Sequence, residues 1–115
     1  MKRAYAPHFV LIRAALEAIA AYRPADRATF LAQPMAQDAI LMRLQEIGEN
    51  LAQIRRIDEA AFTKVADDSW IQLIGLRNVI SHGYHTINQE RIWFILDKRL
   101  PILVANLDAA ESDLA

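Results

Sequence analysis

Residues 77 to 86, with the sequence RNVISHGYHT, concentrate polar side chains between two apolar stretches. The chemical groups are a guanidinium, an amide, two imidazoles and a phenol, from Arg77, Asn78, His82, His85 and Tyr84. An imidazole transfers protons near neutral pH, and a guanidinium stabilises the negative charge of a phosphate oxygen. These two residue types suit metal-free cleavage of a phosphodiester, and in RNA the 2′-hydroxyl can serve as the nucleophile.

The spacing within this stretch decides which side chains one helix can bring together. Asn78 and His82 are four residues apart and therefore share one face of a helix. Arg77 is five residues from His82, which places it about 140° further round an ideal helix. In a single copy of the chain, the side chains of Arg77 and His82 are therefore expected on different sides of the helix. Two copies facing each other across a two-fold axis would supply two arginines and two histidines to one groove.

The same residues also have simpler structural interpretations, which stay open at this point. A histidine near a helix end can act as a structural cap, because protonated imidazole suits the carbonyl end of the helix dipole. Arg77 can pair with a carboxylate, and Glu46 and Glu49 are the candidates. Tyr84 can be a packed ring that leaves its hydroxyl exposed.

The composition describes one small domain over residues 1–115 with no thiol chemistry. Without cysteine the chain has no disulfide, no thiolate nucleophile and no cysteine-based zinc site. His82 and His85 are three residues apart and lack further ligands for a metal. We therefore expect no metal site and no cofactor. The net charge of −1 differs from the basic excess of most nucleic-acid-binding proteins, so contact with RNA would need a local basic patch.

The apolar content predicts self-association rather than membrane insertion. Hydrophobic residues make up 54% of the chain, above the usual share, and the excess apolar surface is typical of a protein that forms dimers. No apolar run approaches the about 20 residues that a membrane helix needs. Arg13 and Glu17 interrupt the apolar stretch near the N-terminus, unlike a signal peptide. We expect a cytoplasmic protein with no membrane partner.

Apolar residues recur at three- and four-residue steps in four stretches of the chain. We expect long helices over Pro7–Tyr22, Pro34–Ile54, Ser69–Gly83 and from Thr86 towards the C-terminus, with short helical turns over Asp26–Gln33 and after Asp58. Gly48 lies inside the second long helix, where we expect another helix to cross closely. Four long helices with short connections predict an all-α antiparallel four-helix bundle with one or two short extra helices.

Residues that start, end or bend helices mark the boundaries of these elements. Ser69 is a candidate N-cap, and Thr86 and Gln89 stand at the spacing of a capping box. Gly83 is expected to end its helix in the left-handed conformation. Pro101 is expected to kink the last helix, because it removes the bond to the carbonyl of residue 97.

Two segments together resemble a known family. The stretch WIQLIGLRNVISHGYHTI, which starts at Trp70, contains an arginine, four residues, a histidine, one residue and a tyrosine. The stretch DAILMRLQEIGENLAQI contains an Ile-Gly-Glu element at residues 47–49. Both resemble HEPN domains, and more narrowly the HepT-like toxin family, and the likeness covers nearly the whole chain.

The resemblance implies a helical homodimer that is the toxin of a type VII toxin–antitoxin pair and a metal-independent endoribonuclease. By this resemblance, Arg77 would contact the scissile phosphate, His82 would transfer protons and Asn78 would support them. The cognate antitoxin of the family is a minimal nucleotidyltransferase of the MntA type. It transfers AMP to the motif tyrosine, which is Tyr84 here, and the added phosphate charge would hinder RNA binding.

Two other functions stay open from the sequence. The chain could be a non-catalytic helical partner or substrate-binding subunit of a minimal nucleotidyltransferase, with Arg77 and His82 in structural or ligand-binding roles. It could also be a plain dimeric scaffold. The scaffold requires Arg77 to be held by an internal carboxylate, away from any open groove.

Overall fold

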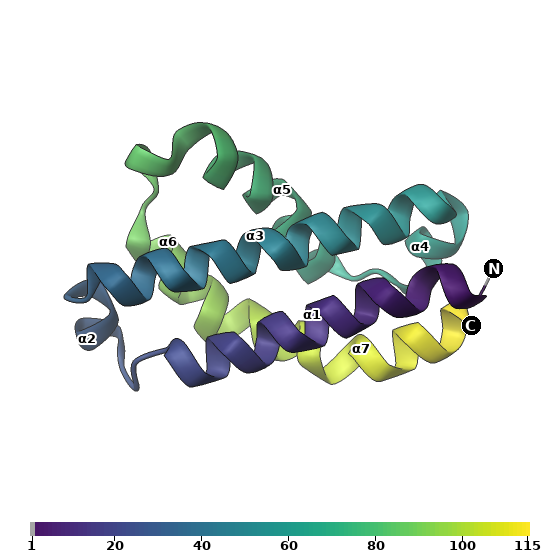
Figure 1. The fold of residues 1–115 in the computed structure, drawn as a ribbon, viewed down its shortest axis with the longest axis horizontal. Coiled ribbons are helices and arrows are strands. Elements are labelled where there is room, and N and C mark those ends of the chain that lie inside the picture. The colour runs from purple at the N-terminus through teal and green to yellow at the C-terminus, as the bar shows by residue number, and fades with distance from the viewer. Residues whose placement is uncertain (1) are drawn as a thin grey trace.

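The computed structural model describes residues 2–115, which are helical along nearly their whole length (Figure 1). The helices are α1 (Lys2–Tyr22), α2 (Arg27–Leu31), α3 (Pro34–Ile57), α4 (Glu59–Val65), α5 (Asp68–Gly83), α6 (Gln89–Phe94) and α7 (Leu100–Leu114). A 3₁₀ turn, η1 (Tyr84–Thr86), follows α5, and a π-helical segment, η2 (Ile95–Arg99), joins α6 to α7. These residues contain no strand, which confirms the all-α prediction.

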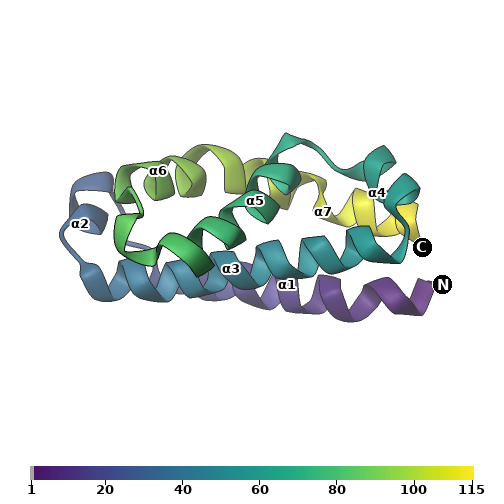
Figure 2. The same cartoon turned by 90° about the horizontal axis from the view of Figure 1, so that it is seen from above.

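The long helices form an antiparallel bundle. In Figures 1 and 2, α1 and α3 run side by side in opposite directions, α5 returns across α3, and α6 to α7 runs back to the end where both termini lie. The short helices α2 and α4 cap the two ends of α3. The predicted four-helix bundle with two short extra helices is therefore confirmed.

The core is built where the apolar stripes of these helices meet. Trp70 of α5 is fully buried, and its ring contacts Phe9 of α1 and Phe62 of α4 edge-on, with ring centroids 6.5 and 5.6 Å apart. At the other end, Phe30 of α2 packs against Trp93 of α6 at 5.5 Å. Aromatic side chains therefore anchor each short helix to the bundle.

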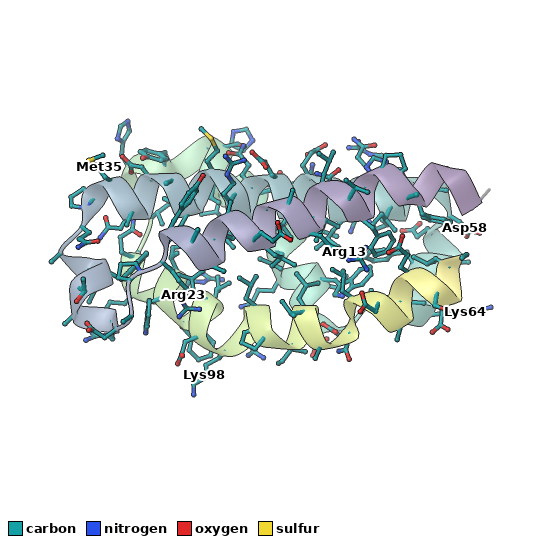
Figure 3. All side chains as sticks on the ribbon, turned by 60° about the horizontal axis from the view of Figure 1, so that its bottom comes forward. Arg13, Arg23, Met35, Asp58, Lys64 and Lys98 are labelled. Atoms are coloured by element: carbon teal, nitrogen blue, oxygen red, sulfur yellow. The ribbon has the colours of Figure 1, made fainter. Side chains whose placement is uncertain are left out.

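The first helix is an amphipathic core helix that also has the length and hydropathy of a membrane span between Ala4 and Tyr22. One stripe of it is buried against the bundle, formed by Tyr5, Phe9, Ile12, Ala15 and Ile19. Arg13 binds Asp108 of α7 at 2.6 Å and Glu111 at 2.5 Å, in the position that Figure 3 labels. Burial in the bundle accounts for this stripe, whereas Val10 and Leu11 of the same helix are 63% and 51% exposed.

Three predicted helix starts are wrong. α1 begins at Lys2, so Pro7 lies inside it and removes one backbone hydrogen bond near its start. α5 is capped by Asp67 rather than Ser69, because the Asp67 carboxylate accepts from the backbone N–H of Ser69 at 2.7 Å. α6 is capped by Asn88, whose side chain accepts from two backbone N–H groups, rather than by Thr86.

The structure corrects the predicted conformation of Gly83 at the end of α5 and shows where the last helix is irregular near Pro101. Gly83 ends α5 as expected, but with φ −134° and ψ 34°, and the chain continues directly into η1, so no left-handed cap forms. The departure from α geometry near Pro101 lies one turn earlier, in η2. There the carbonyl of Leu96 accepts from Nη1 of Arg23 at 3.2 Å. Pro101 itself falls in the first turn of α7, where its missing N–H is tolerated.

Candidate functional site

Gly48 sets the distance between α3 and α5 at the residues of the motif. A Cβ atom at Gly48 would lie 2.4 Å from the carbonyl oxygen of Leu73 and 3.1 Å from the Cβ of Arg77. Only glycine lets the α5 backbone lie this close, and the predicted close crossing is confirmed. The glycine of the Ile-Gly-Glu element therefore determines how close the Arg77 side chain lies to α3.

Arg77 lies at an open groove of about 310 Å³ between α3 and α5. The groove is lined by Met42, Gln45, Glu46, Glu49, Asn50, Arg77, Asn78 and Ser81. The Arg77 side chain is 18% exposed, and its Nη1 donates to the carboxylate of Glu49. The Nε of Arg77 is buried and has no hydrogen-bond partner in the described part of the chain. The Nη1 edge of the guanidinium is therefore paired with a carboxylate, while the groove beside Arg77 is open.

Acidic side chains outnumber basic ones in the lining of this groove, which has two glutamates and one arginine. Glu46 pairs with Arg43 at 2.9 Å, and Glu49 pairs with Arg77. Partial burial raises the pKa of Glu49, but hydrogen bonds from Gln53 and Arg77 outweigh it, so its pKa lies below the ordinary value. Glu49 is therefore held as the anion against Arg77.

Sequence reasoning named Arg77, Asn78 and the two candidate carboxylates, of which Glu49 is the partner of Arg77, but missed the amides of α3 that also line the groove. Nε2 of Gln45 donates to Oγ of Ser81 at 2.8 Å, across the groove. Asn50 holds the His8 ring at 2.9 Å and donates to the carbonyl of Glu46 at 2.9 Å. The signal was present, because the groove residues of α3 recur at three- and four-residue steps from position 42 to position 50.

His82 lies on a different face of α5 from Arg77. It is exposed and does not line the groove. It shares a helix face with Asn78, Gly75 and Ile71, all of them exposed, and the Ile71 side chain is 51% exposed. The protomer therefore brings Arg77 and Asn78 together and leaves His82 apart, in the way that the five-residue spacing predicts.

Tyr84 stands in η1, directly after α5. It is 44% exposed, and its hydroxyl donates to the carboxylate of Asp38 on α3. Its ring meets the His85 ring edge-on, with centroids 5.8 Å apart. The hydrogen bond to Asp38 raises the pKa of the Tyr84 phenol, and slight burial adds to this effect. Sequence reasoning did not identify Asp38.

Metal ligands do not cluster within residues 2–115. No group of three or more His, Cys, Asp or Glu side chains there is arranged to hold a metal ion.

Comparison with known families supplies the decisive observation. Residues 12–110 match the family model described as Ribonuclease HepT-like. The chain belongs to the ribonuclease HepT-like family. The matched region includes the groove, His82, Tyr84 and Asp38. No curated protein and no solved structure matches the chain.

Membership in the HepT-like family supports a ribonuclease-type role for the chain. The position of Arg77 bears on the scaffold interpretation, which required Arg77 to be paired with a carboxylate away from any open groove. Arg77 is paired with Glu49, but the pair lies at an open groove. The geometry therefore lacks the separation from any open groove that the scaffold interpretation requires.

Proposed function

We propose that this HepT-like chain is the toxin of a type VII toxin–antitoxin pair, acting as a metal-independent endoribonuclease in the cytoplasm. The observation that carries this proposal is the position of Arg77 and Asn78 at an open groove, with His82 exposed on the adjoining face of the same helix end. Asn78 and His82 are exposed, and Arg77 lines the groove with a side chain that is 18% exposed and paired with Glu49.

The chemistry assigned to these residues needs only proton transfer and charge stabilisation. The 2′-hydroxyl of RNA attacks the adjacent phosphorus and loses its proton, and the bond from phosphorus to the 5′-oxygen breaks. His82 transfers protons, Arg77 stabilises the charge that develops on the phosphate oxygens, and Asn78 orients the phosphate. The expected products carry a 2′,3′-cyclic phosphate and a 5′-hydroxyl.

A homodimer supplies what the protomer lacks. Arg77 and His82 point in different directions, so a productive pair takes the arginine of one protomer and the histidine of the other. The exposed α5 face with Ile71 and Gly75 supports such pairing, because a Cβ at Gly75 would meet nothing within 4 Å and another helix can approach closely.

Neutralisation is assigned to AMP transfer onto Tyr84 by a MntA-like minimal nucleotidyltransferase antitoxin. Tyr84 is exposed and follows His82 by two residues, so an attached nucleotide lies beside the catalytic end of α5. Its phosphate adds negative charge where the RNA backbone must approach. RNA is the substrate in this proposal, no cofactor takes part and no membrane is involved.

One observation favours a second function, the non-catalytic partner or substrate-binding subunit of a nucleotidyltransferase. The groove carries two glutamates against one arginine, and Arg77 is already neutralised by Glu49. A groove of this charge suits an ordered structural contact as well as a catalytic one. In this case expression of the chain alone leaves cell growth unaffected.

Cleavage of RNA by the purified protein in the presence of a chelator tests the proposal. The wild type is expected to cut a mixed RNA pool, and His82→Ala to lose at least about 100-fold in rate, the share general acid–base catalysis supplies. His85→Ala is the matched control, since it removes a histidine three residues away and is expected to cut normally. Equal cutting by His82→Ala and wild type would contradict the role of His82. No cutting by the wild type would contradict the ribonuclease activity itself.

A further inference from the structure

The contact between Tyr84 and Asp38 joins two segments that are 46 residues apart in the chain. Asp38 stands near the start of α3, and both side chains are exposed at the surface. The Tyr84 hydroxyl donates to the Asp38 carboxylate, while the other described contact of the ring, the edge of His85, does not involve the hydroxyl. The one oxygen of Tyr84 that can accept a transferred group therefore carries its proton directly against a carboxylate.

We infer that Asp38 is the proton acceptor for group transfer onto the Tyr84 oxygen, so that the chain carries the general base of its own modification site. The inference rests on the proposed function in that Tyr84 is the acceptor. It goes beyond it by assigning a catalytic residue to the substrate protein rather than to the transferase.

The transfer balances with a nucleoside triphosphate as the second reactant. The Tyr84 oxygen attacks the α-phosphorus and forms the new O–P bond, while the bond from that phosphorus to the bridging oxygen breaks. Pyrophosphate leaves with the electron pair, and the phenolic proton passes to the Asp38 carboxylate and then to water. A carboxylate accepts the proton of an attacking hydroxyl in the same way in phosphoryl transfer by kinases.

Asp38 also explains why Tyr84, rather than another tyrosine, is prepared for this chemistry. Tyr5 is 5% exposed and cannot be reached. Tyr22 is 41% exposed, nearly as much as Tyr84, but its hydroxyl accepts from Nη2 of Arg43 at 3.5 Å. Among the described tyrosines, Tyr84 is the one whose hydroxyl donates to a carboxylate. The raised pKa of Tyr84 makes the free phenolate scarcer, so attack depends on proton removal during the step.

The reactivity of Tyr84 towards a phosphorus electrophile tests the inference without any transferase. Diisopropyl fluorophosphate forms an O–P bond with the phenol and releases fluoride, and peptide mass spectrometry measures labelling at each tyrosine. In Asp38→Asn, which keeps an oxygen in place but cannot take the proton, labelling of Tyr84 is expected to fall about 100-fold at neutral pH. Labelling of Tyr22 in the same molecule is expected to stay constant and reports on the reagent and the fold.

The pH profile separates a base from a structural contact. With Asp38 present, labelling of Tyr84 is expected to vary little with pH above neutrality. In Asp38→Asn it is expected to rise about tenfold per pH unit, because only the phenolate then reacts. His85→Gln, which alters the other neighbour of the ring, is expected to behave like the wild type. An unchanged rate in Asp38→Asn, or a loss in His85→Gln instead, would overturn the assignment.

The same variants separate this inference from the proposed function. If the wild type fails to cut RNA but Asp38→Asn slows labelling of Tyr84, the ribonuclease proposal fails and the assignment of Asp38 stands. If RNA is cut normally and labelling is unchanged in Asp38→Asn, the assignment of Asp38 fails and the ribonuclease proposal stands.

Discussion

Two anions compete for the guanidinium of Arg77. Within the protomer, the carboxylate of Glu49 holds it, with the Glu49 side chain 48% exposed. In the proposed reaction an RNA phosphate takes that place. A fully exposed ion pair is worth roughly 0.2–1 kcal/mol, and this pair is about half exposed at Glu49 but mostly buried at Arg77. It uses Nη1 of the guanidinium, whereas a phosphate can bind a guanidinium through two parallel hydrogen bonds, so we expect a phosphate to compete with Glu49.

Glu49→Gln is expected to tighten RNA binding by about two- to fivefold, because it frees Arg77 and removes a negative charge from the groove. Fluorescence anisotropy of a labelled RNA measures this in the inactive His82→Ala background. Glu46→Gln is the matched control. It also removes one negative charge from the groove, but Glu46 pairs with Arg43 rather than with Arg77. If Glu46→Gln tightens binding as much as Glu49→Gln, only the groove charge matters and release of Arg77 contributes nothing.

Acid is expected to break the same ion pair. Burial opposes ionisation of Glu49, but hydrogen bonds from Gln53 and Arg77 prevail and lower its pKa below the ordinary 4.5. The pair therefore stabilises the fold fully above pH 4.5, and this contribution is lost as the pH falls below that value through the lowered pKa. Urea unfolding of wild type and Glu49→Gln over this range should show the wild type losing more stability. Parallel pH curves would exclude the linkage.

At the scale of elements, the site depends on how closely α5 crosses α3. Gly48→Ala places a methyl group against the backbone carbonyl of Leu73, which has no flexible end to move. We expect a loss of about 1–3 kcal/mol in the free energy of unfolding and a displacement of α5. RNA cleavage should fall further than stability alone explains, because Arg77 moves with α5.

Gly75→Ala provides the comparison for the stability measurement, since a Cβ there meets nothing within the protomer. Because Gly75 lies on the face proposed for pairing, both variants are compared at a dilution where the protein is monomeric. Alanine is a better helix former than glycine by about 1 kcal/mol, so the free energy of unfolding of Gly75→Ala is expected to rise, whereas that of Gly48→Ala falls. A Gly48→Ala variant as stable and as active as the wild type would show that the two helices do not need this close contact.

The sequence allowed the helices to be predicted better than their ends. Apolar periodicity identified every long helix, and Gly48 was correctly assigned to a close crossing. The caps were less certain because aspartate, asparagine, serine and threonine all accept backbone N–H bonds. Asp67 and Ser69 both suit the start of α5, and the structure distinguishes them by the extended backbone of Asp67 (φ −102°, ψ −179°) and by its bond from the N–H of Ser69.

At the scale of the whole molecule, the sequence suggested one pairing between distant segments, Arg77 with Glu46 or Glu49, but not the others. The motif residues of α5 were visible as a cluster, and the five-residue spacing correctly separated Arg77 from His82. The contacts of Gln45 with Ser81 and of Asp38 with Tyr84 join residues 36 and 46 positions apart. Such contacts depend on how α5 lies on α3, which periodicity within one helix does not determine.

Mixing two inactive variants tests the claim that the ribonuclease site is shared between protomers. In a mixed dimer of Arg77→Ala and His82→Ala, one of the two sites combines the intact arginine of one chain with the intact histidine of the other. Unfolding and refolding an equal mixture should restore about a quarter of wild-type RNA cleavage, because half of the dimers are mixed and each has one working site. If mixed dimers form, as native mass spectrometry can verify, and still do not cut RNA, the shared site is contradicted.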